Sequence, residues 1–163
     1  MSWLSNLLGL KGRPPTLRLK YGIRHWELPG VEAFSTLFRA LNGWLPEDAI
    51  LYFECAFSGP DIQAYLAGIA VSARANIARG TLWPRPARFH VPAKGNLEQL
   101  AVLAEHRERL ALAEHFHAYI DGELLLEWYD VIDHPIRLND SISEERVRVL
   151  ADLLGVTYGR ESD

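Results

Sequence analysis

Alternating apolar and polar residues predict a strand near the beginning of the chain. Between positions 17 and 23 every second residue is apolar, namely Leu17, Leu19, Tyr21 and Ile23. A period of two places one face of a strand in the core. The compact apolar run from Ile50 to Phe57 has strand length and predicts a central strand. Nearby prolines limit residues 88–91 to an edge strand.

Four segments carry apolar residues at helical spacing: residues 31–41, 62–69, 97–110 and 144–154. This spacing predicts helices with one buried face. Asn96 is a candidate N-cap for the third helix. The sequence from Ser141 to Glu144 has the form of a capping box and predicts that Ser141 caps the last helix, which Gly155 ends.

Asp121-Gly122 lies between two strand-like runs, residues 115–120 and 123–129, and predicts a two-residue type I′ hairpin. In the register of such a loop, His115 faces Trp128 and His117 faces Leu126. The predicted order is then β-α-β-α-(β)-α-β-β-α. It occupies one domain, residues 16–158, after an N-terminal extension and hinge (residues 1–15) and before a tail (residues 159–163).

The predicted fold class is α/β, at the boundary with α+β. Helical connections between strands favour parallel pairing, and the hairpin adds an antiparallel pair, so we expect a mixed sheet with helices packed on it. From Ile50 onward the order resembles the thioredoxin fold. The segment from Phe53 to Asp61 also resembles the strand and Cys-Gly-Pro-Cys helix start of that family, with Ser58 and Asp61 in place of the cysteines. The resemblance implies a thioredoxin-like core without thiol–disulfide chemistry.

The N-terminal ten residues place Trp3, Leu4, Leu7 and Leu8 on one helical face. We expect this face to dock on the domain or on a partner chain rather than on a membrane. The segment lacks the basic start and cleavage pattern of a secretory signal, and no apolar run approaches the roughly 20 residues of a membrane span. Cys55 is the only cysteine, so no intramolecular disulfide forms. These features predict a cytoplasmic protein.

Charge is unevenly distributed along the chain. Residues 1–97 carry 11 Lys/Arg and 6 Asp/Glu, whereas residues 98–163 carry 6 and 15. No acid lies between Asp61 and Glu98, and the candidate ligand-binding residues of this stretch are Arg79, Trp83, Arg85, Arg88 and Lys94. Arginine forks suit phosphates or carboxylates, and an aromatic ring can stack on a base. The overall pI of 5.9 favours instead neutralisation of these cations by the acidic C-terminal half.

His115 and His117 are two apart on a predicted strand and therefore share a face. With Asp130 from the following loop, they could supply the two imidazoles and one carboxylate of a zinc or iron(II) site. Apolar neighbours in the predicted register favour a structural role for the pair. Glu54 is a carboxylate inside an apolar run, which leaves open an edge position, an arginine partner or a buried acid.

No catalytic motif is present, and we predict no catalytic residue and no cofactor. The sequence therefore favours a non-enzymatic protein-interaction module, whose partner is another protein or a second copy of the chain. One alternative is a binder of an anionic ligand or nucleic acid through the Arg-rich segment. The other is a small metal-dependent enzyme that uses the His-x-His pair.

Overall fold

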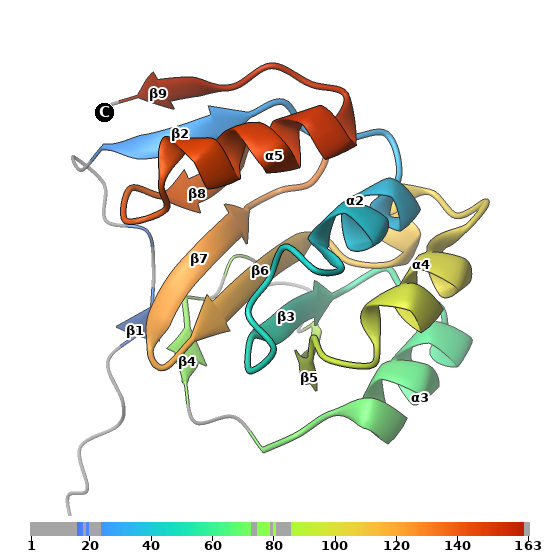
Figure 1. The fold of residues 1–163 in the computed structure, drawn as a ribbon. Coiled ribbons are helices and arrows are strands. Elements are labelled where there is room, and N and C mark those ends of the chain that lie inside the picture. The colour runs from blue at the N-terminus through green and yellow to red at the C-terminus, as the bar shows by residue number, and fades with distance from the viewer. Residues whose placement is uncertain are drawn as a thin grey trace, which may run out of the picture.

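The computed structural model (Figure 1) describes residues 16–17, 19, 24–72, 75–78, 80 and 86–161. The fold is a mixed α+β domain built on one large sheet. Its strands are β2 (His25–Leu28), β3 (Ile50–Cys55), β5 (Ala87–Pro92), β6 (His115–Ile120), β7 (Glu123–Trp128), β8 (Ile136–Asn139) and β9 (Gly159–Glu161). The seven strands lie in the order β5-β3-β6-β7-β8-β2-β9, and each neighbouring pair is antiparallel.

Four α-helices accompany the sheet in the described part of the chain: α2 (Phe34–Leu41), α3 (Pro60–Ile69), α4 (Leu97–Ala104) and α5 (Glu144–Leu154). A short 3-10 turn, η1 (Arg109–Ala111), precedes β6. Figure 1 shows α2 and α5 lying across the front of the sheet, with α4 beside α2. The apolar core fills the space between these helices and the sheet.

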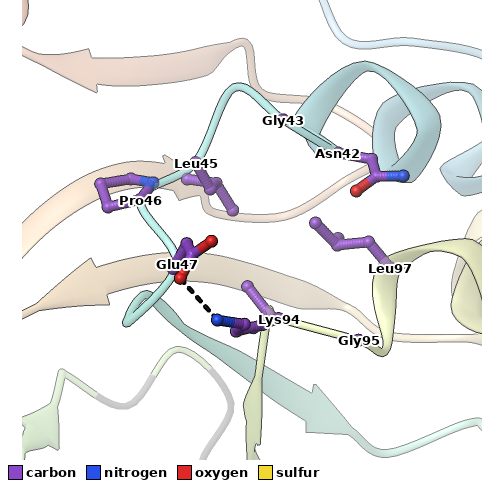
Figure 2. Close-up of a pocket in the computed structure, with 9 residues that line it drawn as sticks. Asn42, Gly43, Leu45, Pro46, Glu47, Lys94, Gly95 and Leu97 are labelled. Carbon is purple, nitrogen blue, oxygen red and sulfur yellow. Dashed lines mark hydrogen bonds and ion pairs between the residues drawn. The ribbon is translucent and has the colours of Figure 1, made fainter.

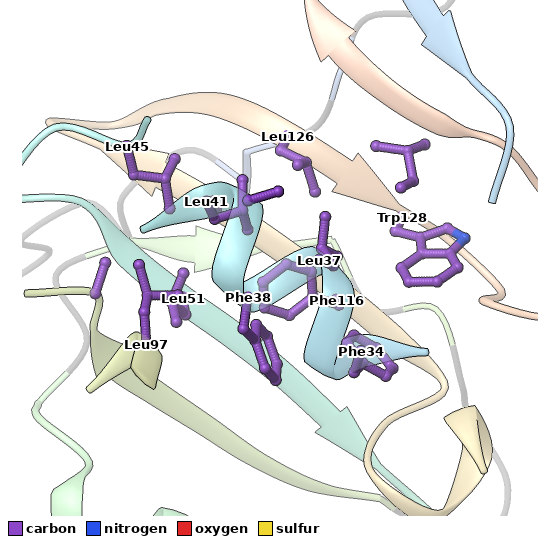
Figure 3. Close-up of a cluster of buried hydrophobic side chains, with 14 of the residues drawn as sticks. Phe34, Leu37, Phe38, Leu41, Leu45, Leu51, Leu97, Phe116, Leu126 and Trp128 are labelled. Atoms are coloured by element: carbon purple, nitrogen blue, oxygen red, sulfur yellow. The ribbon is translucent and has the colours of Figure 1, made fainter. Parts of the chain in front are cut away.

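The buried face of α2 explains how the helices are held on the sheet. Phe34, Leu37, Phe38 and Leu41 recur at helical spacing and are all buried. Figure 3 shows these side chains against the aromatic residues of the sheet. The Phe34 ring lies 5.1 Å from that of Trp128, measured between ring centroids. This packing turns one face of the central strands toward the helices. The side chains that alternate with these along each strand therefore lie on the opposite face of the sheet.

A second, smaller cluster covers part of the opposite face of the sheet. Two short strands, β1 (Thr16–Leu17) and β4 (Asn76–Ile77), pair with each other in parallel. Ile77 packs against Tyr52, Tyr119 and Leu124 of the large sheet, and Leu19 joins the same cluster. The sheet is therefore buried on both faces at its centre.

The expected mixed sheet is wrong, because the large sheet contains no parallel pair within the described residues. β3 and β5 flank α3 but run antiparallel as direct neighbours. A parallel pair requires a long connection, but a long connection does not require a parallel pair. The chain between Ile69 and Ala87 is long enough to reverse direction. The thioredoxin-like core is accordingly not confirmed.

The element order also differs from the predicted one at both ends. Residues 16–17 form β1, residues 20–23 lie outside the described residues, and the strand of the large sheet falls at His25–Leu28. The apolar pattern does not predict β8 or β9. Three residues of the predicted tail form β9, which pairs with β2. The N-terminal extension and hinge, residues 1–15, lies outside the described residues.

Several local predictions are confirmed. β5 is an edge strand, and Gly155 ends α5 in the left-handed conformation. Asn96 stands at the N-cap position of α4, but its side chain makes no capping hydrogen bond to the helix. The N-cap position of α5 is Ser143, not Ser141, and the Ser143 side chain makes no capping hydrogen bond. Ser141 lies in the preceding turn, where its backbone N–H donates to Oδ1 of Asn139. The third helix is also shorter than predicted, since α4 ends at Ala104.

Candidate functional site

The face of the sheet that lies away from the helices carries the polar residues singled out in the sequence. In the register of β3, Glu54 pairs with Arg88 on β5 and with His115 on β6. Two residues earlier, Tyr52 pairs with His90 and His117. Alternate residues of a strand point to the same face. β3 therefore brings together two groups of candidate residues that are far apart in the sequence.

Glu54 is the buried centre of this face, with an exposed side-chain fraction of 0%. Its Oε2 accepts a hydrogen bond from the Tyr52 hydroxyl at 2.8 Å and lies 3.5 Å from Nε of Arg88. The backbone N–H of Gly80 also donates to Oε2. Burial, followed by the charge of Glu54, raises the pKa of Tyr52 and keeps the phenol protonated. The odd carboxylate of the apolar run thus has an arginine partner.

His115 is held in one tautomer. Its Nδ1 accepts a hydrogen bond from the backbone N–H of Asp130 at 2.8 Å, so the proton of the neutral ring lies on Nε2. The ring stacks on Tyr129 at a centroid distance of 4.4 Å. Gly80 passes so close that a Cβ there would lie 2.2 Å from Nε2. Burial lowers the pKa of His115, which favours this neutral form.

His117 is buried more completely, with 3% of its surface exposed. Its ring stacks parallel to that of Tyr52 at a centroid distance of 5.5 Å. Nδ1 makes no hydrogen bond with any residue that the structure describes. Burial lowers the pKa of His117 to about 3, so the ring is neutral at physiological pH.

Because of a β-bulge in the hairpin, the two histidines do not have the cross-strand neighbours that the sequence predicted. The tip of the hairpin is as predicted, with positive φ at Asp121 and Gly122. The register then shifts between Ala118 and Tyr119, because Tyr119 pairs with Leu124 but Ala118 pairs with Leu126. His117 consequently faces Glu127 instead of Leu126. Because β7 has one extra residue at the bulge, the β7 residues that follow the bulge lie on the opposite face of the sheet from the one that the predicted register gives them.

The same shift changes the partner of Trp128. The indole pairs with Phe116 in the core, not with His115. The two histidines therefore belong to the polar face, and the apolar residues that the sequence placed opposite them face the helices.

Asp130 contacts His115 through its backbone N–H, whereas its carboxylate interacts with other residues. The carboxylate accepts from the Ile132 N–H at 3.3 Å and lies 3.9 Å from Nδ1 of His134. The residue has a φ of 49°, which aims its N–H at His115. Among the residues that the structure describes, no three His, Cys, Asp or Glu side chains are grouped so as to hold a metal ion.

The Arg-rich segment is described only in part, since Arg79, Trp83 and Arg85 lie outside the described residues. Arg88 pairs with Glu54. Lys94 pairs with Glu47 at the edge of a shallow pocket (Figure 2). Both carboxylates belong to the first half of the chain, not to the acidic C-terminal half that the charge distribution favoured.

A groove beside α5 has no counterpart among the predicted sites. It has a volume of about 450 Å³ and is lined by Asn42, Gly43, Trp44, Glu145, Arg146, Val149 and Leu153. Trp44 and Arg146 fix one another, because the indole N–H donates to the Arg146 carbonyl and the guanidinium donates to the Trp44 carbonyl. The guanidinium also lies 5.1 Å from the centre of the Trp44 ring.

Val149 and Leu153 form the exposed apolar edge of this groove. They are one helical turn apart on α5, and 45% and 57% of their surfaces are exposed. The sequence did hold a signal for them. The last helix has more apolar residues than its buried face uses, since Val147, Leu150 and Leu154 already fill that face.

Cys55 is an unreactive packing residue. Its thiol donates a hydrogen bond to the Leu112 carbonyl, and burial raises the pKa of the thiol to about 12. A thiol of that pKa is almost entirely protonated at neutral pH and is a poor nucleophile.

Comparison of the chain with protein-family models, with curated proteins and with solved structures finds no match. In the part of the chain that the structure describes, every helix is too short or too polar to cross a membrane.

Proposed function

We propose that this chain is a non-enzymatic protein-interaction module that binds a partner protein through the groove beside α5. The observation that carries the proposal is the exposure of Val149 and Leu153 as adjacent apolar side chains at the edge of this groove. Single exposed apolar residues are common on protein surfaces, but an adjacent pair beside a concave site favours a contact surface.

The groove suggests the chemistry of the partner. Its base is rigid, because Trp44 and Arg146 are locked together by two hydrogen bonds. A preorganised base lowers the entropic cost of binding. The lining carries one exposed carboxylate, that of Glu145, and one guanidinium, that of Arg146, so a partner that inserts an apolar side chain with a polar group beside it would match the site.

The two alternative functions receive less support. Arg88 and Lys94 each have a carboxylate partner, so an anionic ligand would have to compete with Glu54 or Glu47 for them. His115 and His117 are buried, and Nδ1 of His115 is already engaged by the Asp130 N–H. The cytoplasmic location that the sequence suggests is part of the proposal and rests on cysteine usage.

Affinity capture with matched surface variants tests the proposal. Leu153→Glu places a charge at the edge of the groove, whereas Val102→Glu places one on α4, at a valine that is 58% exposed. Wild type and Val102→Glu should retain the same protein from a native extract, and Leu153→Glu should lose it. All three proteins should have melting temperatures within about 2 °C, because surface substitutions rarely change stability by more than about 0.5 kcal/mol.

Equal retention by Leu153→Glu and the wild type would contradict the groove as the contact site. If no protein is retained, the alternatives are tested directly. A thermal-shift screen with nucleotides and oligonucleotides tests the anionic-ligand function, and metal analysis of the purified protein tests the metal-dependent one.

A further inference from the structure

The turn that follows α2 contains the dipeptide Asn42-Gly43, the only asparagine in the chain that is followed by glycine. The turn is closed by the Leu41 carbonyl, which accepts hydrogen bonds from the N–H groups of Trp44 at 3.1 Å and Leu45 at 3.0 Å. Asn42 and Gly43 are both exposed. They line the groove beside α5 and also the shallow pocket of Figure 2.

The side chain of Asn42 and the backbone nitrogen of Gly43 are not held by hydrogen bonds. In the described part of the chain, the Gly43 N–H donates to no acceptor and the Asn42 amide has no partner. Gly43 has a φ of +83°, and no atom lies within 4 Å of the place that a Cβ would take, so its nitrogen is open to approach. The ψ of Asn42 is 115°, and the Asn42–Gly43 peptide must rotate before this nitrogen reaches Cγ of Asn42. No hydrogen bond to either reacting group resists that rotation.

Two other asparagines of the described chain have the opposite environment. The Asn96 amide donates to the Pro92 carbonyl at 2.9 Å. The Asn139 side chain donates to the Leu124 carbonyl and accepts from the Ser141 N–H. Both asparagines are followed by a residue with a side chain. They are therefore internal controls for the reactivity of Asn42.

We propose that Asn42 is a site of spontaneous deamidation that alters the base of the groove beside α5. The Gly43 nitrogen loses its proton to solvent and attacks Cγ of Asn42. The N–Cγ bond forms, the Cγ–Nδ2 bond breaks, and the leaving nitrogen takes a proton from solvent and departs as ammonia. Water then opens the succinimide ring at one of its two carbonyls and leaves aspartate or isoaspartate. The net change consumes one water and releases one ammonia, so no oxidant or reductant is needed.

Either product changes the groove. Its described lining contains one carboxylate, that of Glu145, and one guanidinium, that of Arg146, so a new carboxylate at position 42 makes the lining acidic. Isoaspartate also adds a methylene group to the main chain between Leu41 and Trp44. The Trp44 N–H is bonded to the Leu41 carbonyl and its indole to the Arg146 carbonyl. A longer main chain at this point displaces Trp44 from these partners and loosens the base of the groove.

Peptide mapping of aged protein tests the modification. The folded protein and the chain unfolded in urea are incubated in the same mildly alkaline buffer, and mass spectrometry with isomer separation follows each asparagine. Asn42 of the folded protein should convert within about tenfold of its rate in the unfolded chain, because an exposed turn opens without unfolding the core. Asn96 and Asn139 should keep their amides in the folded protein.

Gly43→Asn is the matched variant for the mechanism. Asparagine accepts a positive φ, but its side chain hinders the attacking nitrogen, so conversion of Asn42 should slow about tenfold. An Asn42 amide that stays intact in the folded protein after the unfolded chain has converted would overturn the proposal. Conversion of Asn42 at the same rate in Gly43→Asn would overturn it too, since the glycine nitrogen would not be the nucleophile.

Two further measurements test the consequence for the groove. The isoaspartate form, separated by ion exchange, should melt about 2–4 °C below fresh protein, and equal melting temperatures would overturn the loosening of Trp44. The effect on binding rests on the function proposed for the groove. Aged wild type should retain less partner protein than aged Asn42→Gln, because glutamine closes the corresponding ring slowly. If fresh wild type retains no protein, the proposed function fails, whereas the peptide map still decides whether Asn42 is the modification site.

Discussion

Glu54 and His117 lie on the same buried face of the sheet, and the protein accommodates them in opposite ways. Glu54 faces a guanidinium and a phenol hydroxyl, which offset part of the cost of burying a carboxylate. His117 faces the ring of Tyr52 and has a pKa lowered to about 3, so it is buried as a neutral aromatic group. The first arrangement depends on charge, and the second depends on the absence of charge.

The neutral state of His117 makes a prediction about pH. Its folded pKa of about 3 lies below the ordinary value of 6.5, so the unfolded chain binds more protons between these values. The free energy of unfolding should therefore fall as the pH drops from about 6.5 toward 3. For this residue the slope is at most about 1.4 kcal/mol per pH unit. His115 and His90, whose pKa values are also lowered by burial, act in the same direction.

Urea denaturation of His117→Gln between pH 7 and pH 4 measures this slope. Glu114 and Glu127 have pKa values raised by burial and oppose the histidines, so the difference between variant and wild type is the informative quantity. The variant should lose less stability on acidification than the wild type. His106→Asn is the control, because His106 is exposed and has a positive φ that asparagine accepts. Equal slopes for His117→Gln and the wild type would show that folding does not lower the pKa of His117.

Among the elements, the β6–β7 hairpin has a turn that the sequence predicts and a strand register that it does not predict. The turn depends on Gly122, whose φ of +83° is strained for a residue with a side chain. We expect Gly122→Val to lower the free energy of unfolding by about 1–3 kcal/mol. Gly68→Val is the control, because Gly68 lies in α3 without a positive φ, and a Cβ added there would meet no other atom within 4 Å. It should change stability by less than about 0.5 kcal/mol.

Chemical denaturation of the two variants gives the comparison. Equal stabilities for Gly122→Val and Gly68→Val would argue that the hairpin can adopt a different turn at little cost.

Local signals explain which parts of the fold were predictable from sequence. Glycine at positive φ and apolar residues at helical spacing act within a few residues, so the turn, α2 and the end of α5 could be predicted. The bulge beside Tyr119 has no such signal, because it depends on which residues of β7 reach the core. β8 and β9 are four and three residues long and acquire their strand character only through pairing with other strands, β8 with β7 and β2 and β9 with β2.

The candidate site also has features that local sequence signals predict and features that they do not predict. The shared face of His115 and His117 follows from their spacing, whereas their contact with β3 follows from sheet order. Strand order is a property of the whole chain, and no local pattern near Glu54 indicates that Arg88 and His115 become its neighbours. The groove beside α5 also required the position of Trp44, which is about one hundred residues away in the sequence.

At the scale of the whole molecule, the C-terminus completes the sheet. β9 covers the edge of β2, and Arg160 lies 4.8 Å from the centre of the Trp26 ring. Tyr158 contacts the same ring edge to face. Figure 1 shows β2 between β8 and β9, so residues from both ends of the described chain meet at this edge. An uncovered edge strand is prone to pair with another molecule.

Deletion of residues 158–163 should therefore lower the free energy of unfolding by about 2 kcal/mol or more, since Trp26 loses part of its cover. The truncated protein should also self-associate in sedimentation velocity experiments. Deletion of residues 162–163 alone keeps β9 and serves as the control. A truncated protein that stays monomeric with the stability of the control would show that β9 contributes little to this edge.

If the molecule acts through the groove beside α5, a photo-crosslinker at the edge of the groove should capture the partner protein. Benzoylphenylalanine is incorporated at position 153, at the edge of the groove, and separately at position 102, on the exposed side of α4. After irradiation in the cells that express the protein, position 153 should give one discrete adduct with a partner protein, and position 102 should not. No adduct at position 153, or the same adduct from both positions, would show that the groove is not the contact site.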